Sequence, residues 1–123
     1  MSGTYLFIEA PGFTAAVKEY FGTDEAYADF QSGLAGNPDM GKVITGASPL
    51  RKLRWGDKRR GVGKRGGLRV IYIHLPDQQV LFMMDVYGKG ESDDLTVGEK
   101  KDLQSLARKL AEELQLRNHR GKQ

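Results

Sequence analysis

The stretch LRKLRWGDKRRGVGKRGGLRVIY, residues 50–72, decides how the rest of the chain can fold. Positions 51–69 carry nine basic residues and one acid, Asp57, a local excess of +8 in a chain whose net charge is only +3. Removing so many unpaired charges from water would cost several kcal/mol for each one, so this stretch cannot be core. It must face water or an anionic partner, and nucleic acid is the leading candidate. Its basic residues are Arg51, Lys52, Arg54, Lys58, Arg59, Arg60, Lys64, Arg65 and Arg69.

Strands are predicted on both sides of this basic stretch. Residues 50–55 alternate so that Lys52 and Arg54 share one face of a strand while Leu53 and Trp55 share the other. The glycine-rich segment 56–67 is then a long hairpin connection. Residues 68–75 and 80–87 are the strongest strand candidates, with a turn at residues 76–77. Because residues 80–84 are all apolar, this strand is predicted to be central and covered on both faces.

Helices are predicted at the two ends of the sequence. After a short strand at 5–8, one helix begins at Pro11 and ends at Gly22, and a second is capped by Thr23 or Asp24 and stopped by residues 36–38. Residues 39–49 have the composition of a loop. A capping box at residues 96–99 opens a last helix, and residues 117–123 are predicted to be a flexible tail. The apolar face of that helix is predicted to consist of Leu103, Leu106, Leu110 and Leu114.

This order of elements predicts a small α+β domain, with an antiparallel sheet, two N-terminal helices and one C-terminal helix. A chain of 123 residues, 39% apolar and 28% charged, fits one domain with a single core. Disulfides are excluded because there is no cysteine. No secretory signal peptide and no membrane span are expected. We also predict no metal site, since the two histidines are far apart and the acids at 91, 93 and 94 are explained by helix capping and charge pairing.

Three features coincide along the chain: the two N-terminal helices, the LRKLRW…GKRGGLRVIY strands, and the VYGKGESDDLT segment before the capped last helix. Together they resemble the RelE/ParE superfamily of toxins from bacterial type II toxin–antitoxin systems, and HigB-type members in particular. The resemblance covers nearly the whole chain, from about residue 5 to the last helix. It implies a RelE-like fold for a single domain.

The activity implied by this resemblance is that of a ribosome-dependent mRNA endoribonuclease that uses no metal and no cofactor. In such enzymes the ribose 2′-hydroxyl attacks the adjacent phosphate, leaving a cyclic phosphate and a 5′-hydroxyl. The family positions at the scissile phosphate are matched here by Lys52, Arg54, Arg69 and Lys89. Gly90 and Thr96 stand where the best-known members have an arginine and a tyrosine, so the acid for the leaving group is not assigned.

Metal-free RNA cleavage requires a base, positive charge at the phosphorane and an acid. Neighbouring cations disfavour the charged form of a lysine, so Lys52 is the candidate base, with Arg65 and Arg69 stabilising charge. Lys64 would bind phosphate or, together with Lys89, assist the leaving group. Lys52 and Arg54 would otherwise be the solvated face of a half-buried strand.

Other residues have two interpretations each. Lys58, Arg59 and Arg60 would contact RNA backbone, or they would only increase solubility. Tyr87 would stack on a base or transfer a proton, or it would be an interfacial tyrosine. Trp55 and Tyr72 would stack on bases or belong to the core; for Trp55 the core is favoured. His74 is expected to be a strand residue with its hydrogen bonds satisfied.

The resemblance also implies partners and a location: a cognate antitoxin of the helix-turn-helix HigA type in a hetero-oligomeric complex, the ribosome with its mRNA, and the bacterial cytoplasm. No membrane partner is expected. Two other functions remain open. One is inhibition of DNA gyrase, as in ParE-like proteins, with the same fold and no nuclease chemistry. The other is RNA binding without catalysis.

Overall fold

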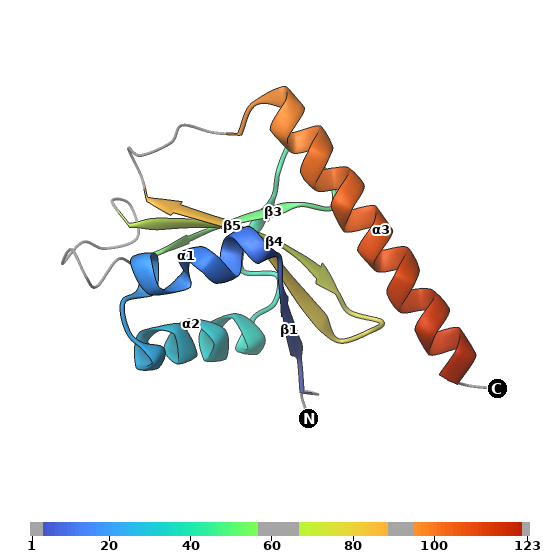
Figure 1. The fold of residues 1–123 in the computed structure, drawn as a ribbon, viewed down its shortest axis with the longest axis horizontal. Coiled ribbons are helices and arrows are strands. Elements are labelled where there is room, and N and C mark those ends of the chain that lie inside the picture. Colours follow the sequence, from blue (N-terminus) through green and yellow to red (C-terminus); the bar gives the residue numbers. More distant parts are fainter. Residues whose placement is uncertain (1–3, 57–66, 89–94, 122–123) are drawn as a thin grey trace.

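A five-stranded sheet forms the centre of the protein, with helices on both of its faces (Figure 1). The computed structural model describes residues 4–56, 67–88 and 95–121, with side chains as far as Arg117. The strands are β1 (Leu6–Glu9), β2 (Lys42–Val43), β3 (Arg51–Trp55), β4 (Leu68–Leu75) and β5 (Val80–Gly88), in the spatial order β1-β5-β4-β3-β2. The helices are α1 (Pro11–Phe21), α2 (Asp24–Gly36) and α3 (Val97–Gly121). The α+β class predicted from the sequence is confirmed.

The helices begin and end where local chemistry predicts. Pro11 occupies the first turn of α1, where its missing N–H costs nothing, and Gly22 follows the last residue of the helix with φ of 84°. Thr23 rather than Asp24 caps α2, since the Thr23 hydroxyl accepts a hydrogen bond from the Ala26 amide at 3.1 Å. Each boundary therefore depends on residues within one helical turn.

The capping box of α3 is confirmed by two reciprocal hydrogen bonds. The Glu99 amide donates to the Thr96 hydroxyl at 3.1 Å, and the Thr96 amide donates to the Glu99 carboxylate at 2.9 Å. The hydrogen bond from the Thr96 amide, and then an interaction with the Thr96 side chain, hold the pKa of Glu99 below its usual value. The Thr96 hydroxyl thus accepts a hydrogen bond that caps the start of the helix.

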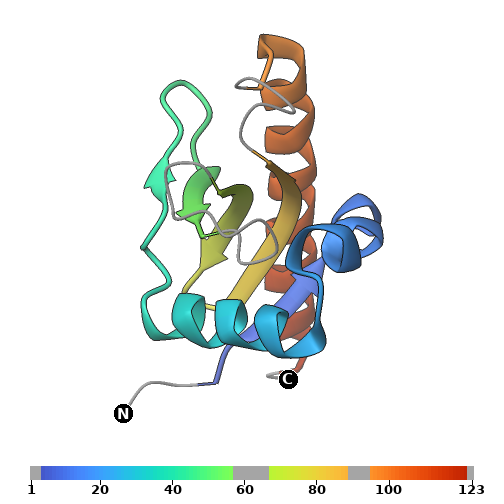
Figure 2. The ribbon, with the colours of Figure 1, turned by 90° about the vertical axis from the view of Figure 1, so that its left-hand side faces the viewer.

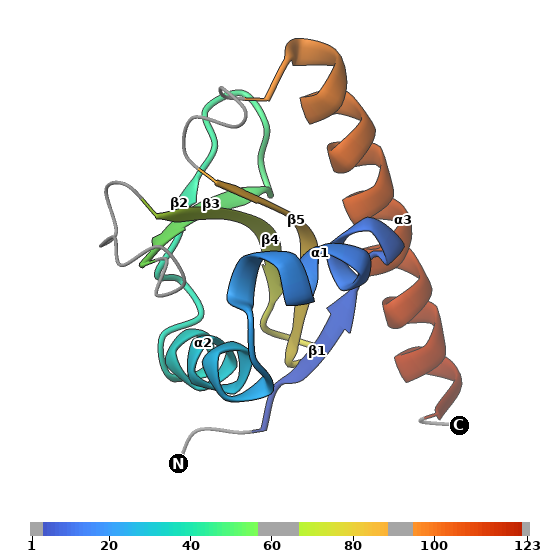
Figure 3. The ribbon, with the colours of Figure 1, turned by 60° about the vertical axis from the view of Figure 1, so that its left-hand side comes forward.

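The two faces of the sheet are buried by different helices, as the turned views show (Figures 2 and 3). On one face α1 and α2 supply Phe13, Phe30 and Leu34, all fully buried against strand residues such as Leu53 and Tyr72. On the other face α3 packs through Ala107 and neighbouring leucines against residues such as Ile73 and Phe82. β5 lies between β1 and β4, and its all-apolar run is covered on both faces, as predicted.

The sheet differs from the prediction at both of its edges. β1 pairs with β5 in parallel, so the sheet is mostly rather than wholly antiparallel. Residues 42–43, within the predicted loop 39–49, form the two-residue strand β2 along β3. A strand of two residues is too short to be identified from the alternation of apolar and polar side chains, so β2 could not be predicted from the sequence.

Two predictions about α3 were wrong in detail. Leu106 is 42% exposed, and the buried residue of that turn is Ala107 at 0%. Positions 103, 107, 110 and 114 follow the 4-3-4 spacing of one helix face, whereas position 106 lies about 60° to the side of position 103. The helix also continues to Gly121, through residues 117–121 that were predicted to be a flexible tail. None of the helices in the described part of the chain has the length and apolar character that crossing a bilayer requires.

Candidate nucleic-acid interface

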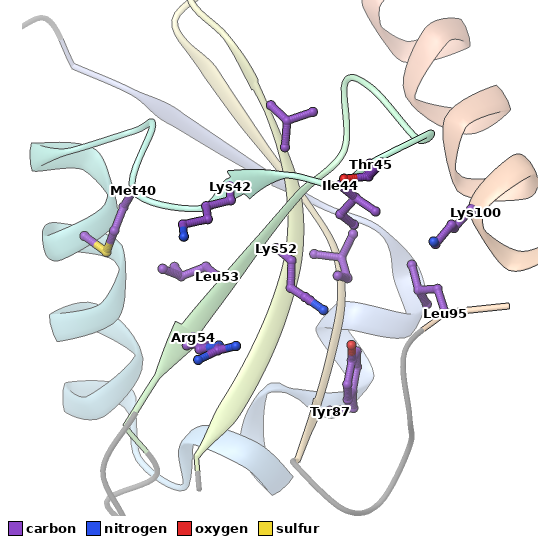
Figure 4. A pocket seen from close by; sticks show the side chains of 12 residues that line it. Met40, Lys42, Ile44, Thr45, Lys52, Leu53, Arg54, Tyr87, Leu95 and Lys100 are labelled. Atoms are coloured by element: carbon purple, nitrogen blue, oxygen red, sulfur yellow. The ribbon is translucent and has the colours of Figure 1, made fainter. Parts of the chain in front are cut away.

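An open groove of about 530 Å³ lies on the α3 side of the sheet, between the β2 edge and the start of α3 (Figure 4). Its four cationic side chains come from three separate elements: β2, β3 and α3. We call it the basic groove. It is lined by Lys42, Lys52, Arg54 and Lys100, together with Met40, Val43, Ile44, Thr45, Leu53, Ile71, Tyr87 and Leu95.

Lys52 and Arg54 lie in this groove because of the two-residue period of β3. Their strand neighbour Leu53 is 4% exposed and packs with the α1 and α2 core. Alternation therefore turns Lys52 and Arg54 to the opposite face, as the sequence predicted. Both side chains line the groove.

Arg69 lies beside this pair but is not exposed. The β3–β4 register places it opposite Arg54, and the β4–β5 register places it opposite Tyr87, so the three residues form one row across the sheet. Arg69 is only 8% exposed, and its guanidinium donates to the Leu68 carbonyl at 3.3 Å. The prediction that the whole basic stretch faces water or a partner was therefore wrong for Arg69, because β4 is an inner strand with neighbours on both sides.

Tyr87 joins the groove from β5. Its ring is largely buried with the α3-side core at 8% exposure, while its hydroxyl is directed into the groove on the side of Lys52 (Figure 4). Little of the ring face is left for stacking on a base. Of the two functional roles predicted for Tyr87, the geometry favours a role of the hydroxyl.

Two lysines of the groove were missed by sequence reasoning. Lys42 reaches it from β2, and Lys100 reaches it from the first turns of α3. Both lie outside the basic stretch, separated from Lys52 by 10 and 48 residues. A signal for Lys42 did exist: it is the lone cation in a loop of small and apolar residues. For Lys100, one charge among many on α3, the sequence held no signal.

Two other candidates, Trp55 and Tyr72, lie away from the groove. Trp55 packs edge-on against Phe30, with ring centroids 5.3 Å apart, so its favoured assignment to the core is confirmed. Tyr72 is fully buried, which excludes base stacking. Its hydroxyl donates to the Pro38 carbonyl at 2.7 Å and accepts from the Gly41 amide at 2.9 Å. Burial raises the pKa of Tyr72.

His74 is a satisfied strand residue, as predicted. Its Nδ1 lies 2.8 Å from an Asp39 carboxylate oxygen, and its Nε2 lies 2.8 Å from the Tyr5 hydroxyl. The same carboxylate lies 3.2 Å from the Arg51 guanidinium. The hydrogen bond from His74, and then the charge of Arg51, keep the pKa of Asp39 below its usual value. Both ring nitrogens of His74 are engaged in this network, and His74 does not line the basic groove.

The remaining predicted site residues lie outside the residues that the structure describes. They include the three predicted contacts to RNA backbone, two residues with predicted roles at the phosphate, and the lysine after the last strand. They are Lys58, Arg59, Arg60, Lys64, Arg65 and Lys89. The acidic residues at positions 91, 93 and 94 also lie outside the described residues.

The described site is cationic rather than metal-binding in character. Within residues 4–56, 67–88 and 95–117, no three His, Asp or Glu side chains are grouped so as to hold a metal ion. Four positive side chains over an apolar floor can bind an anion that also presents an apolar or planar part. No known protein-family model matches this chain.

Proposed function

We propose that this protein is a toxin of the RelE/ParE superfamily, HigB-type, which cleaves mRNA on the ribosome without a metal or cofactor. One observation carries the proposal: Lys52, Arg54 and Tyr87, three residues selected from the sequence, line one groove although they come from two different strands. A phosphodiester with its ribose and base matches the charge and the apolar floor of that groove. The match in chemistry supports a ribonucleotide substrate.

In the proposed reaction, the neutral amine of Lys52 accepts the proton of a ribose 2′-hydroxyl. The oxygen then attacks the adjacent phosphorus, and the bond from phosphorus to the 5′-oxygen breaks. Arg54 stabilises the negative charge of the phosphorane by direct contact. Arg69, lying in the same row of the sheet, adds positive charge from beside it. The products are a 2′,3′-cyclic phosphate and a 5′-hydroxyl.

The leaving 5′-oxygen needs a proton, and we assign this role to the Tyr87 hydroxyl. The position that carries a tyrosine in the best-known relatives of the proposed family is Thr96, whose hydroxyl accepts a helix-capping bond here. Among the described residues, Tyr87 brings a hydroxyl into the groove from the strand next to Arg69. The division of labour would therefore differ from that of the best-known members.

Expression of the toxin in growing bacteria tests this function. We expect growth arrest and new 5′ ends, found by primer extension, within translated messages. Lys52→Ala should abolish both, and Tyr87→Phe should reduce cleavage strongly. Lys18→Ala is the matched control, since Lys18 is an exposed lysine on α1 outside the groove. Cleavage by the Lys52→Ala variant at equal soluble expression would refute the proposed site.

The same experiment separates the alternative functions. DNA breaks that depend on gyrase, with intact messages, would instead indicate a ParE-like inhibitor. Intact messages and intact DNA, with RNA still bound, would indicate a non-catalytic RNA-binding protein.

For the cytoplasmic toxin proposed here, the cell must mask the groove, and we propose a helix-turn-helix antitoxin of the HigA type as that partner. Co-purification of the toxin with the product of an adjacent gene tests the partner.

A further inference from the structure

The cations of the basic groove fall into two sets. Lys52 and Arg54, both on β3, belong to the proposed reaction centre with Tyr87. Lys42 and Lys100 come instead from the two elements that border the groove, β2 and α3. Figure 4 shows these two lysines on opposite sides of Lys52, with the amines of Lys42 and Lys52 directed apart. The proposed reaction gives Lys42 and Lys100 no role, so their charges need another explanation.

The backbone at Lys42 is anchored by the residue before it. The Gly41 amide donates to the buried Tyr72 hydroxyl at 2.9 Å, and the Gly41 carbonyl accepts from the Arg51 guanidinium at 2.6 Å. A Cβ atom on Gly41 would lie 2.8 Å from the Tyr72 ring, so glycine is needed for this close approach. These contacts, more than the two-residue pairing of β2, fix the point from which the Lys42 side chain enters the groove.

Lys100 is anchored at the opposite border by the start of α3. Its amide donates to the Thr96 carbonyl at 2.9 Å, and it directly follows the capping box of Thr96 and Glu99. A cation in the first turns of a helix gains nothing from the helix dipole, which favours acids there. The half-buried Lys100 side chain lines the groove, so its charge serves the groove rather than the helix.

Both amines are available to an extended anion. Within residues 4–56, 67–88 and 95–117, no hydrogen bond or ion pair engages the side chain of Lys42 or Lys100. Lys42 lies on β2 and Tyr87 on β5, which are three strand spacings, or about 14 Å, apart across the sheet. A ligand that reaches from the reaction centre to Lys42 must therefore be long and carry more than one negative charge.

We propose that the basic groove is a track for single-stranded RNA, in which Lys42 and Lys100 bind two different backbone phosphates on opposite sides of the scissile one. Apolar side chains between the cations, such as Ile44, Ile71 and Leu95, can contact base faces, which only a single strand leaves exposed. Because both lysines have anchored backbones, less ordering is needed when the strand binds. This inference rests on the proposed function for the identity of the scissile phosphate.

The salt dependence of RNA binding tests the track. The probe is a labelled single-stranded RNA with 2′-fluoro groups in place of the 2′-hydroxyls, so that it cannot be cleaved. Lys42→Gln and Lys100→Gln should each reduce the slope of log K against log salt by about 0.7 and weaken binding several-fold at low salt. The double variant should reduce the slope by about 1.4. Lys42→Arg and Lys100→Arg, which keep the charge, should keep the wild-type slope.

Two exposed lysines outside the groove supply matched controls, Lys18→Gln on α1 and Lys109→Gln on α3, and both should bind like the wild type. A double variant whose slope falls no further than that of a single variant would overturn the assignment of two separate phosphates. Wild-type slopes in Lys42→Gln and Lys100→Gln, or no binding of the probe by the wild-type protein, would overturn the track.

The uncleavable probe separates a failure of the track from a failure of the proposed function. Loss of slope in both glutamine variants, with no cleavage of messages in cells by the wild type, would support the track and refute the nuclease. Cleavage in cells together with wild-type slopes in both variants would refute the track and leave the nuclease standing.

Discussion

Replacement of Gly33 by alanine tests whether Trp55 belongs to the core or is available to nucleic acid. Gly33 lies inside α2, where a Cβ atom would come within 2.9 Å of Trp55 Cη2 and 3.4 Å of Cζ3. The Trp55 ring cannot easily move aside, since it rests edge-on against Phe30, which is fully buried. The added methyl group must therefore shift either the helix or the indole.

Two opposing effects set the size of the change. Alanine in place of glycine inside a helix stabilises by about 0.5–1 kcal/mol. Overpacking a well-filled site costs about 1–3 kcal/mol. We therefore expect Gly33→Ala to lower the free energy of unfolding by about 1 kcal/mol. Gly98→Ala is the matched control: Gly98 lies near the start of α3, where a Cβ atom would have nothing within 4 Å. That variant should be neutral or slightly stabilising.

Urea denaturation followed by circular dichroism measures both variants at the same pH. The m-value should stay unchanged, because the surface exposed on unfolding is the same. Adding Trp55→Leu to Gly33→Ala should recover part of the loss, so that the two changes are coupled in a double-mutant cycle. If Gly33→Ala were as stable as Gly98→Ala, the indole would not be packed on α2. Trp55 would then have to be reconsidered as an RNA contact.

Three further changes test individual contacts. Burial is the main cause of the raised pKa of Asp85, so ionisation of this carboxyl costs folding stability as the pH rises above its pKa in the unfolded chain. Asp85→Asn should therefore stabilise the protein at about pH 7 and not at about pH 3, as measured by thermal unfolding. The pKa of Asp39 is lowered, so the contribution of its carboxylate to stability is present at neutral pH and is lost as the pH falls through its pKa in the folded protein. Asp39→Asn should therefore destabilise the protein at about pH 7 and have no such effect in acid. Equal stability of this variant and the wild type at about pH 7 would contradict the contact with His74. Thr96→Val removes a helix cap and should cost about 1 kcal/mol in urea denaturation, with wild-type stability arguing against the capping box.

Prediction from the sequence was most successful where the deciding interactions lie within a few residues. The Thr23 cap, the box formed by Thr96 and Glu99, and the stop after Gly36 all depend on neighbours in the chain. The facing of Lys52 away from Leu53 depends only on the period of a strand. The class of the fold and part of the basic groove follow from these local rules.

The sequence by itself therefore determined the three helices, four of the five strands, the order of these elements along the chain and which residues of β3 face away from the core. Only the tertiary structure decided that Arg69 is buried, since burial depends on the strands placed on each side of β4. It likewise decided that Lys42 and Lys100 meet Lys52 in one groove, and that Ala107 rather than Leu106 enters the core. Local pattern fixes the direction of a side chain relative to its own strand or helix. What that side chain meets there depends on contacts between residues far apart in the chain, which no periodicity encodes.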